Sequence, residues 1–357
     1  MQHYEILEKI KAQFYAWWNR ENDIPLLSVY ARERKRPKSD SLHAPEELEA
    51  RWKDEEYLLE SEKYKWSSTY CGGVAFPVYN PNLGPDILGA CTGYSDIKFG
   101  EDTSWAIPKI EDLNDIGDIQ LDENNPWWKK IFSMTRSAVK GSDGEFFVGM
   151  TDLHPGTDGL VSIRGAQNLC YDLIDCPEAV DNVLRKITEF YKDIYTRLAD
   201  VLDAEKSGYT TWNNIWSDVP YYIVCSDFSA MIGTEDYERF VAPHIEAETG
   251  FLKHSIYHLD GPAALRHLDR ILAMENLNGV QWVPGAGNAP MREWLDVLKK
   301  IQNAGKLIEV SVTAQDIKPL CDNLSPQGLC MRLDADSPEE AKELENLVSK
   351  YKVKKFY

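Results

Sequence analysis

From about residue 145 onward, the sequence alternates short apolar runs with longer segments of helical periodicity. Continuous apolar strands joined by helices pair in parallel and are buried on both faces. The alternation therefore predicts an α/β fold built from strand–helix units. The six apolar runs lie at residues 145–150, 208–214, 255–260, 279–284, 306–312 and 328–334, and the sequence between residues 214 and 248 is expected to be helical.

Two earlier apolar runs, at residues 24–27 and 95–99, bring the number of candidate strands to eight. Eight parallel strand–helix units close into a (β/α)8 TIM barrel, whose chemistry lies at the C-terminal ends of its strands. The competing architecture, an open doubly wound sheet, normally carries a G-x-G-x-x-G or P-loop nucleotide motif. The sequence contains neither motif. We therefore predict a TIM barrel.

The length of 357 residues suits one barrel with additions. We predict a single domain over residues 1–357, with an N-terminal helix at 1–22 and with residues 31–130 inserted as loops and helices that decorate the barrel mouth. A basic patch at 31–38 is read as a solvated loop, with an anion-binding lid as the second interpretation. Its cationic side chains are Arg32, Arg34, Lys35, Arg36 and Lys38.

Composition excludes several classes of function. Lys+Arg 39 against Asp+Glu 58 give a net charge of −19, which disfavours nucleic-acid binding. No apolar run approaches the roughly 18 residues of a membrane span. The seven cysteines are odd in number, scattered and without a C-x-x-C pair, a pattern that suits free thiols in a cytoplasmic protein.

Polar residues follow two of the predicted strands. Asp152 and His154 come after the run at 145–150, and His258 and Asp260 end the run at 255–260. Residues two apart in a strand share a face, so each pair is expected to point to one side. Two such pairs at one barrel mouth would form an acid–base or metal-binding cluster. The bland alternative is that each carboxylate merely orients an imidazole.

Other residues near the strand ends are candidates for a substrate pocket. Indole rings at such positions can wall a pocket, although packing is the commoner reason for them. The candidates are Trp212, Asp227, Tyr257, Gln281 and Trp282. The segment around His154 also approaches the Asp-x-His-x-x-Gly motif of corrinoid-binding domains, but Thr157 occupies the glycine position, so we exclude a corrinoid domain within this chain.

Six segments carry a likeness to a known family. They are residues 160–169 (LVSIRGAQNL), 172–178 (DLIDCPE), 225–229 (CSDFS), 237–243 (YERFVAP), 257–261 (YHLDG) and 337–341 (SPEEA). Together they resemble the uroporphyrinogen decarboxylase superfamily, in particular a bacterial subgroup of its corrinoid-linked methyltransferase branch. The resemblance covers roughly residues 145–350 and implies a (β/α)8 barrel.

The resemblance also implies chemistry. Zinc methyltransferases of this superfamily hold Zn²⁺ through a His-x-Cys and a later cysteine. Here His258 matches, Asp260 replaces the first cysteine and Cys330 approximates the second, so these three would hold one divalent metal with a weaker preference for zinc. The decarboxylase proper uses an arginine-bearing loop and no metal, and its Arg-Gln-Ala-Gly-Arg motif is absent.

The sequence thus favours a cytoplasmic enzyme, and the family likeness implies a homodimer. It would move a methyl group between a small methylated substrate and a corrinoid held on a partner protein. Asp152, His154, His258 and Asp260 would be its catalytic residues. The alternatives are a corrinoid-independent decarboxylase or lyase acting on a small acidic or aromatic compound, and a barrel retained as a ligand sensor.

Overall fold

The main sheet of the computed structural model has seven strands, and the model describes residues 2–32 and 42–353. Six of the strands are parallel, and β2 pairs antiparallel with β1 at one edge. Strand β7 is buried along its whole length, as expected for a parallel strand covered on both faces. The strand order is β2 (Thr69–Gly73), β1 (Leu26–Arg32), β11 (Leu329–Ala335), β10 (Leu307–Ser311), β9 (Gly279–Val283), β8 (His254–Asp260) and β7 (Tyr221–Cys225).

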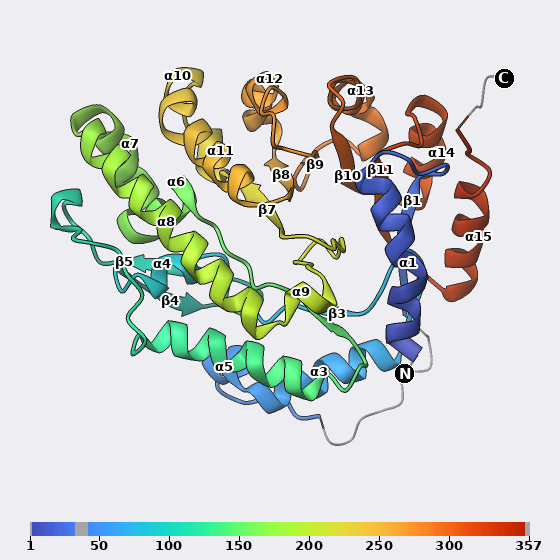
Figure 1. Cartoon of the computed structure of the whole chain (residues 1–357), viewed down its shortest axis with the longest axis horizontal. Helices are drawn as coiled ribbons and strands as arrows, with labels where there is room; N and C mark the ends of the chain where they lie inside the picture. Colours follow the sequence, from blue (N-terminus) through green and yellow to red (C-terminus); the bar gives the residue numbers. More distant parts are fainter. Residues whose placement is uncertain (1, 33–41, 354–357) are drawn as a thin grey trace.

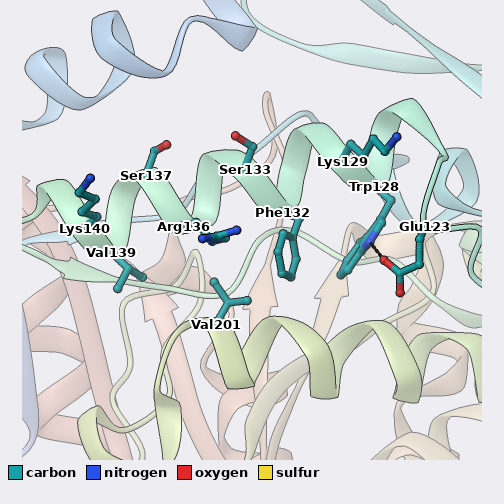
Figure 2. A pocket seen from close by; sticks show the side chains of 10 residues that line it. All are labelled: Glu123, Trp128, Lys129, Phe132, Ser133, Arg136, Ser137, Val139, Lys140 and Val201. Atoms are coloured by element: carbon teal, nitrogen blue, oxygen red, sulfur yellow. Dashed lines mark hydrogen bonds between the residues drawn. The ribbon is translucent and has the colours of Figure 1, made fainter.

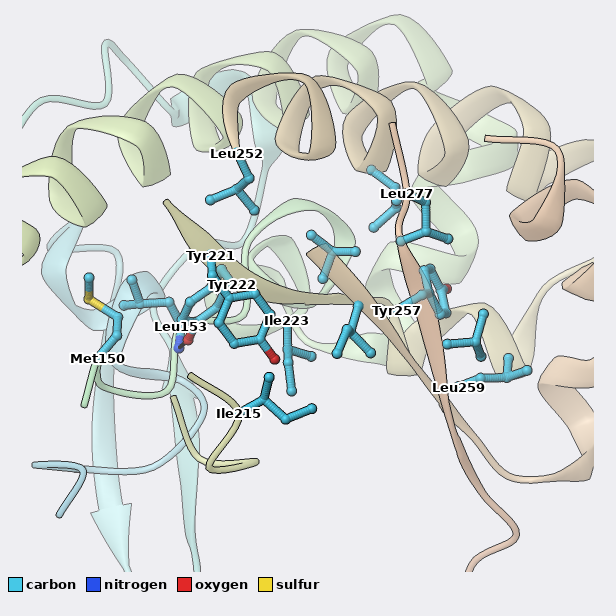
Figure 3. Close-up of a cluster of buried hydrophobic side chains, with 14 of the residues drawn as sticks. Met150, Leu153, Ile215, Tyr221, Tyr222, Ile223, Leu252, Tyr257, Leu259 and Leu277 are labelled. Carbon is cyan, nitrogen blue, oxygen red and sulfur yellow. Dashed lines mark hydrogen bonds between the residues drawn. The ribbon is translucent and has the colours of Figure 1, made fainter. Parts of the chain in front are cut away.

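The strands of this sheet alternate with helices that lie along its outer side (Figure 1). Figure 3 shows buried side chains of β7 and β8, and those on the helix-facing side of the two strands include Tyr222, Tyr257 and Leu259. The helices of this half are α6 (Gly156–Arg164), α7 (Ala166–Asp175), α8 (Pro177–Val201), α9 (Ala204–Ser207), α10 (Thr234–Asp236), α11 (Ala242–Phe251), α12 (Leu268–Leu272), α13 (Leu295–Asn303), α14 (Ala314–Asn323) and α15 (Pro338–Val348).

Helix α15 begins as the sequence indicates. The Ser337 hydroxyl accepts a hydrogen bond from the backbone N–H of Glu340, and Pro338 occupies the first turn. A serine cap satisfies a free N–H of the first turn, and proline has no N–H to leave unpaired there. The helix packs on β1 and β11, which are neighbouring parallel strands near the β2 edge of the sheet.

The first 150 residues add short elements, most of which lie at one end of the sheet (Figure 1). Two short strands, β3 (Val78–Tyr79) and β6 (Phe147–Val148), pair in parallel, whereas β4 (Ser95–Phe99) and β5 (Ser104–Pro108) form an antiparallel hairpin. In the described residues the strand pairing does not close the sheet into a continuous ring. The helices of this region are α1 (Gln2–Trp18), α2 (Leu48–Lys53), α3 (Glu55–Ser67), α4 (Ile87–Cys91) and α5 (Pro126–Gly141).

Two strand predictions need correction. Residues 95–99 form one arm of the β4–β5 hairpin and are not part of the main sheet. Residues 208–214 contain a single bridge, Tyr209 to Ser217, while the strand of this unit is β7, in a segment that was expected to be helical. The reason is local: positive φ at Gly208 and Asn214 bends the chain before and after the two threonines, which prevents a longer ladder.

Helix α1 packs against the beginning of the strands through aromatic contacts. The ring of Trp18 stacks on His254, with centroids 4.1 Å apart and an interplanar angle of 14°, and the Trp18 indole N–H donates to the carbonyl of Trp216. His254 also shares a hydrogen bond with the Ser217 hydroxyl. Burial, opposed by Asp218, lowers the pKa of His254 to about 4.

The pKa of His254 predicts a loss of stability in mild acid. An unfolded histidine has a pKa of about 6.5, so protons bind the unfolded state first as the pH falls from 6.5 towards 4, and the stability present above pH 6.5 is lost. Allowing for the partial exposure of the ring, we expect about 1 kcal/mol between pH 7 and pH 5. Urea unfolding of His254→Phe, which keeps the stacking, should show a correspondingly smaller pH dependence. Equal pH dependence in both proteins would contradict the assignment.

None of the helices in the described part of the chain combines the length and the apolar character required to cross a membrane.

Candidate active site

One row of side chains runs across five neighbouring strands. Strand pairing places Cys225, His258, Gln281, Glu309 and Cys330 side by side on β7, β8, β9, β10 and β11. Residues in register on adjacent strands point to the same face of a sheet. Their strand neighbours point the other way, toward the helices, where Trp282 packs against Trp294. The row therefore lines the side of the sheet that faces away from the helices.

A chain of polar contacts joins the middle of this row. The Nδ1 atom of His258 lies 2.5 Å from Oε1 of Gln281, and because an amide oxygen only accepts, Nδ1 is the donor of this hydrogen bond. Glu309 is 1% exposed, and Nε of Arg332 is 4.0 Å from its Oε1. Burial raises the pKa of Glu309, and the charge of Arg332 opposes that rise. The contact with Gln281 fixes the orientation of the His258 ring.

His258 meets two carboxylates at the end of the strands. Asp227 follows β7 at the start of the short helix η2 (Asp227–Met231), and Asp260 is the last residue of β8. One ligand atom from each of Asp227, His258 and Asp260 lies within 4.8 Å of the others. Both aspartates are exposed and His258 is half-buried. This group could serve as an acid–base set or hold a cation.

The second predicted pair, Asp152 and His154, lies beside this group. Strand β6 ends at Val148, so both residues belong to the loop before α6 and not to a strand. The Nε2 atom of His154 is 3.0 Å from Oδ1 of Asp152, and its Nδ1 atom is 3.6 Å from the Cys225 sulfur. Burial lowers the pKa of His154, but Cys225 and Asp152 outweigh burial and raise it well above its usual value.

Because Cys225 is paired in register with His258 and contacts His154, the two histidines lie at the same end of the sheet. Cys225 connects them. The sequence predicts that the two histidines meet at one end of the sheet, although His154 and His258 are about a hundred positions apart in the chain.

A cavity of about 960 Å³ opens over the ends of β1 and β11. Trp212 forms part of its wall and also meets His258 edge-on, with ring centroids 5.2 Å apart. The cavity therefore adjoins the His258 group through one indole ring. Its lining includes three cations, Arg32, Lys65 and Arg332, three carboxylates, Glu62, Asp334 and Asp336, and the rings of Tyr30 and Trp66. The other residues of the predicted basic patch, Arg34, Lys35, Arg36 and Lys38, lie outside the described residues.

Figure 2 shows a different hollow, of about 670 Å³, along α5 and facing Val201 at the end of α8. Its walls include Trp128, Phe132 and Arg136. The predicted site residues lie elsewhere, so we do not assign the chemistry to this hollow.

Three predicted site residues are placed differently from the others. Tyr257 and Trp282 are buried on the helix-facing side of their strands, where Tyr257 is 3.5 Å from the hydroxyl of Tyr237, so the prediction that they bind substrate needs correction. The cause is strand alternation, since both stand one residue from the inward-facing positions. Cys330 lies three strands away from His258, next to Glu309, and the cation group found at His258 contains Asp227 in its place.

Sequence reasoning missed Asp158, Cys225, Glu309 and Arg332. Glu309 carried a usable signal, because a glutamate in the middle of the apolar run LIEVS is unusual in a doubly buried strand. Arg332 is likewise a charged residue inside the apolar run of the last strand. Asp158 and Cys225 stand out only when the loop before α6 and the end of β7 are brought together in space.

Comparison with solved structures shows a likeness in fold. A methyltransferase from Methanosarcina mazei shares the fold over 96% of this chain and 98% of that chain, with a TM-score of 0.60 and 11% sequence identity. At this identity the likeness shows the fold alone. No family model matches the chain, and no curated protein matches it.

Proposed function

We propose that this protein is a methyltransferase that moves a methyl group between a small methylated substrate and a corrinoid held on a partner protein. The observation that carries the proposal is the group Asp227, His258 and Asp260, next to a cavity large enough for a small molecule. The shared fold with a methyltransferase supports it, as does the resemblance of the sequence to the corrinoid-linked branch of the uroporphyrinogen decarboxylase superfamily.

We infer further that the fold is a distorted eight-stranded barrel. Its eight positions would be β1, β3, β6, β7, β8, β9, β10 and β11. Two hydrogen bonds support this reading at the gaps between ladders. Val74 donates its N–H to the carbonyl of Leu27 on β1, and Met150 donates to the carbonyl of Thr210 ahead of β7. The group at His258 would then lie at the C-terminal mouth, where barrel enzymes carry their chemistry.

Demethylation requires a group that stabilises the departing heteroatom of the substrate. His258 would fill this role as an acid when Nε2 carries a proton, or as a metal ligand when it does not, and Gln281 holds its Nδ1–H in both cases. The donor set of one imidazole nitrogen and two carboxylate oxygens also fits a divalent metal, which Asp227, His258 and Asp260 would hold. Such a metal supplies Lewis-acid polarisation of the heteroatom. Asp152 and His154 would bind or protonate the leaving atom from the neighbouring loop.

One observation favours the second candidate, a decarboxylase or lyase acting on a small acidic compound. Arg32 and Arg332 both line the cavity, and arginine forks pair with carboxylates. Metal analysis of the wild-type protein and of His258→Ala separates the two functions, because a divalent ion that is lost with His258 favours methyl transfer, whereas activity without an ion at His258 favours the lyase.

A direct assay tests the leading proposal. The protein is mixed with cob(I)alamin and a panel of methoxylated and methylated-amine compounds, and methylcobalamin formation is followed by its absorption spectrum. We expect turnover with at least one compound, dependent on the amount of protein. Release of carbon dioxide from acidic compounds with no methyl transfer from any member of the panel would replace the proposal by the lyase.

We also place the protein in the cytoplasm and propose a homodimer. All seven cysteines are free thiols in the structure, which supports a reducing compartment. Gel filtration combined with light scattering tests the dimer.

A further inference from the structure

A second group of potential metal ligands lies beside the proposed active site, and its composition differs from that of the first. His154 in the loop before α6, Asp158 in the first turn of α6 and Cys225 at the end of β7 bring one ligand atom each within 4.8 Å of one another. We propose that these three residues bind a thiophilic divalent cation such as Zn²⁺. This site is distinct from Asp227, His258 and Asp260 and can be tested without a methyl-transfer assay, although it gives His154 the role of a metal ligand in place of the proton donor proposed above.

The separations between the three donor atoms fit a tetrahedral ion. Zinc bonds of about 2.3 Å to sulfur and about 2.0–2.1 Å to nitrogen or oxygen place sulfur about 3.6 Å from each lighter donor, and nitrogen about 3.4 Å from oxygen. In the structure, the Cys225 sulfur is 3.6 Å from His154 Nδ1 and 3.7 Å from Asp158 Oδ2. His154 Nδ1 and Asp158 Oδ2 are 3.8 Å apart. An ion at the centre would require shifts of a few tenths of an ångström.

Neighbouring groups hold two of these ligands in place. Oδ1 of Asp152 lies 3.0 Å from Nε2 of His154, so the carboxylate stands beside one ring nitrogen while the opposite nitrogen, Nδ1, faces the other two ligands. Asp158 accepts hydrogen bonds from the backbone N–H groups of Asp227 and Phe228, at 2.8 and 3.0 Å. The carboxylate is therefore fixed before any ion binds.

A separate observation points to a missing positive charge. Glu248 on α11 is fully buried, and neither of its carboxylate oxygens has a hydrogen-bond partner among the described residues. It lies near the cluster, because a Cβ on Gly156 would be 3.4 Å from its Oε1. Burial and the charge of Asp158 raise the pKa of Glu248. A divalent ion at His154 would balance the charges of Asp158 and a Cys225 thiolate, whose proton leaves to solvent on binding, and would favour the ionised form of the buried Glu248 beside them.

The side chains of His154 and Asp158 remain 16% and 9% exposed, so the ion would keep one position open toward solvent. A coordination sphere of three protein ligands and one open position is typical of catalytic rather than structural zinc. In this assignment both ring nitrogens of His154 are occupied. His154 then acts as a ligand, and the protonation of a leaving group falls to other residues.

Cobalt substitution tests the proposal without any catalytic assay. The full-length protein is treated with a chelator, dialysed and titrated with Co²⁺. We expect one equivalent of cobalt to produce a near-ultraviolet sulfur-to-cobalt charge-transfer band with the intense visible bands of a tetrahedral ion. Asp227, His258 and Asp260 contain no sulfur, so an ion bound only there would not give the charge-transfer band.

Matched variants locate the sulfur. Cys225→Ser should abolish the charge-transfer band, whereas Cys330→Ser, a buried cysteine in the same row, and His258→Ala should retain it. A wild-type protein without the band, or a band that survives in Cys225→Ser, would overturn the proposal. If Cys225→Ser does not fold, His154→Ala decides, because a ligand loss should weaken Co²⁺ binding by at least about tenfold. Unchanged cobalt affinity in a folded His154→Ala would also overturn it.

Discussion

Replacing His258 with alanine is expected to lower kcat/KM for methyl transfer to cob(I)alamin by about 10²- to 10⁴-fold, the usual contribution of a positioned acid–base group. The structure gives this imidazole an oriented Nδ1–H, through Gln281, and two carboxylates at its other side. Alanine removes the imidazole and leaves Asp227 and Asp260 exposed and able to remain hydrated. The loss should therefore appear in activity with little change in the free energy of unfolding.

His254→Phe is the matched control for this prediction. His254 begins the same strand, β8, at the opposite end from His258, and it stacks on Trp18 of α1. Its replacement should leave kcat/KM within about twofold of the wild-type value, because no step of the proposed reaction involves it. Wild-type activity in His258→Ala would remove His258 from the reaction, whichever methylated substrate the assay uses.

The strands β8, β9, β10 and β11 are predictable from sequence because each is a continuous apolar run bounded by glycine or by polar residues. The run at 95–99 was misleading for a physical reason. Its burial alternates, with Ile97 and Phe99 buried and Lys98 exposed, and such alternation is typical of a hairpin with one solvated face. Its length and composition alone resemble those of the parallel strands.

The sequence could predict only those parts of the candidate site whose residues lie close together in the chain. His258 with Asp260, and Asp152 with His154, are neighbours in the sequence, so their spacing indicated their chemistry. The row from Cys225 through Gln281 to Glu309 depends on the register between different strands, and no local pattern encodes it. For the same reason the sequence assigned Trp282 to the pocket, although its strand neighbour Gln281 is the residue that faces inward.

Tyr222→Phe should destabilise the protein by about 2–6 kcal/mol. The Tyr222 hydroxyl donates to the carbonyl of Thr151 at 2.7 Å and accepts from the N–H of Leu153 at 2.5 Å, and Tyr222 is 1% exposed. Phenylalanine leaves both backbone groups buried without a partner, at a cost of about 1–3 kcal/mol each. Urea unfolding with an unchanged m value measures the loss.

Tyr191→Phe is the matched control, since Tyr191 packs beside Tyr222 with ring centroids 6.0 Å apart. Its buried hydroxyl has no hydrogen-bond partner among the described residues, so its removal should be neutral or slightly stabilising. Equal stability of the two variants would contradict the role given to Tyr222.

Tyr222→Phe should also disturb the position of Asp152 and His154. Thr151 and Leu153 flank Asp152 and precede His154, so the Tyr222 hydroxyl fixes the loop that presents both residues. His258 is held independently by Gln281 on β9. Tyr222→Phe should therefore weaken the cobalt–thiolate band, which needs His154 in place, while the His258 group stays intact. A variant that loses stability but keeps the full band would show that the loop at 151–154 is positioned by its neighbours and not by this hydroxyl.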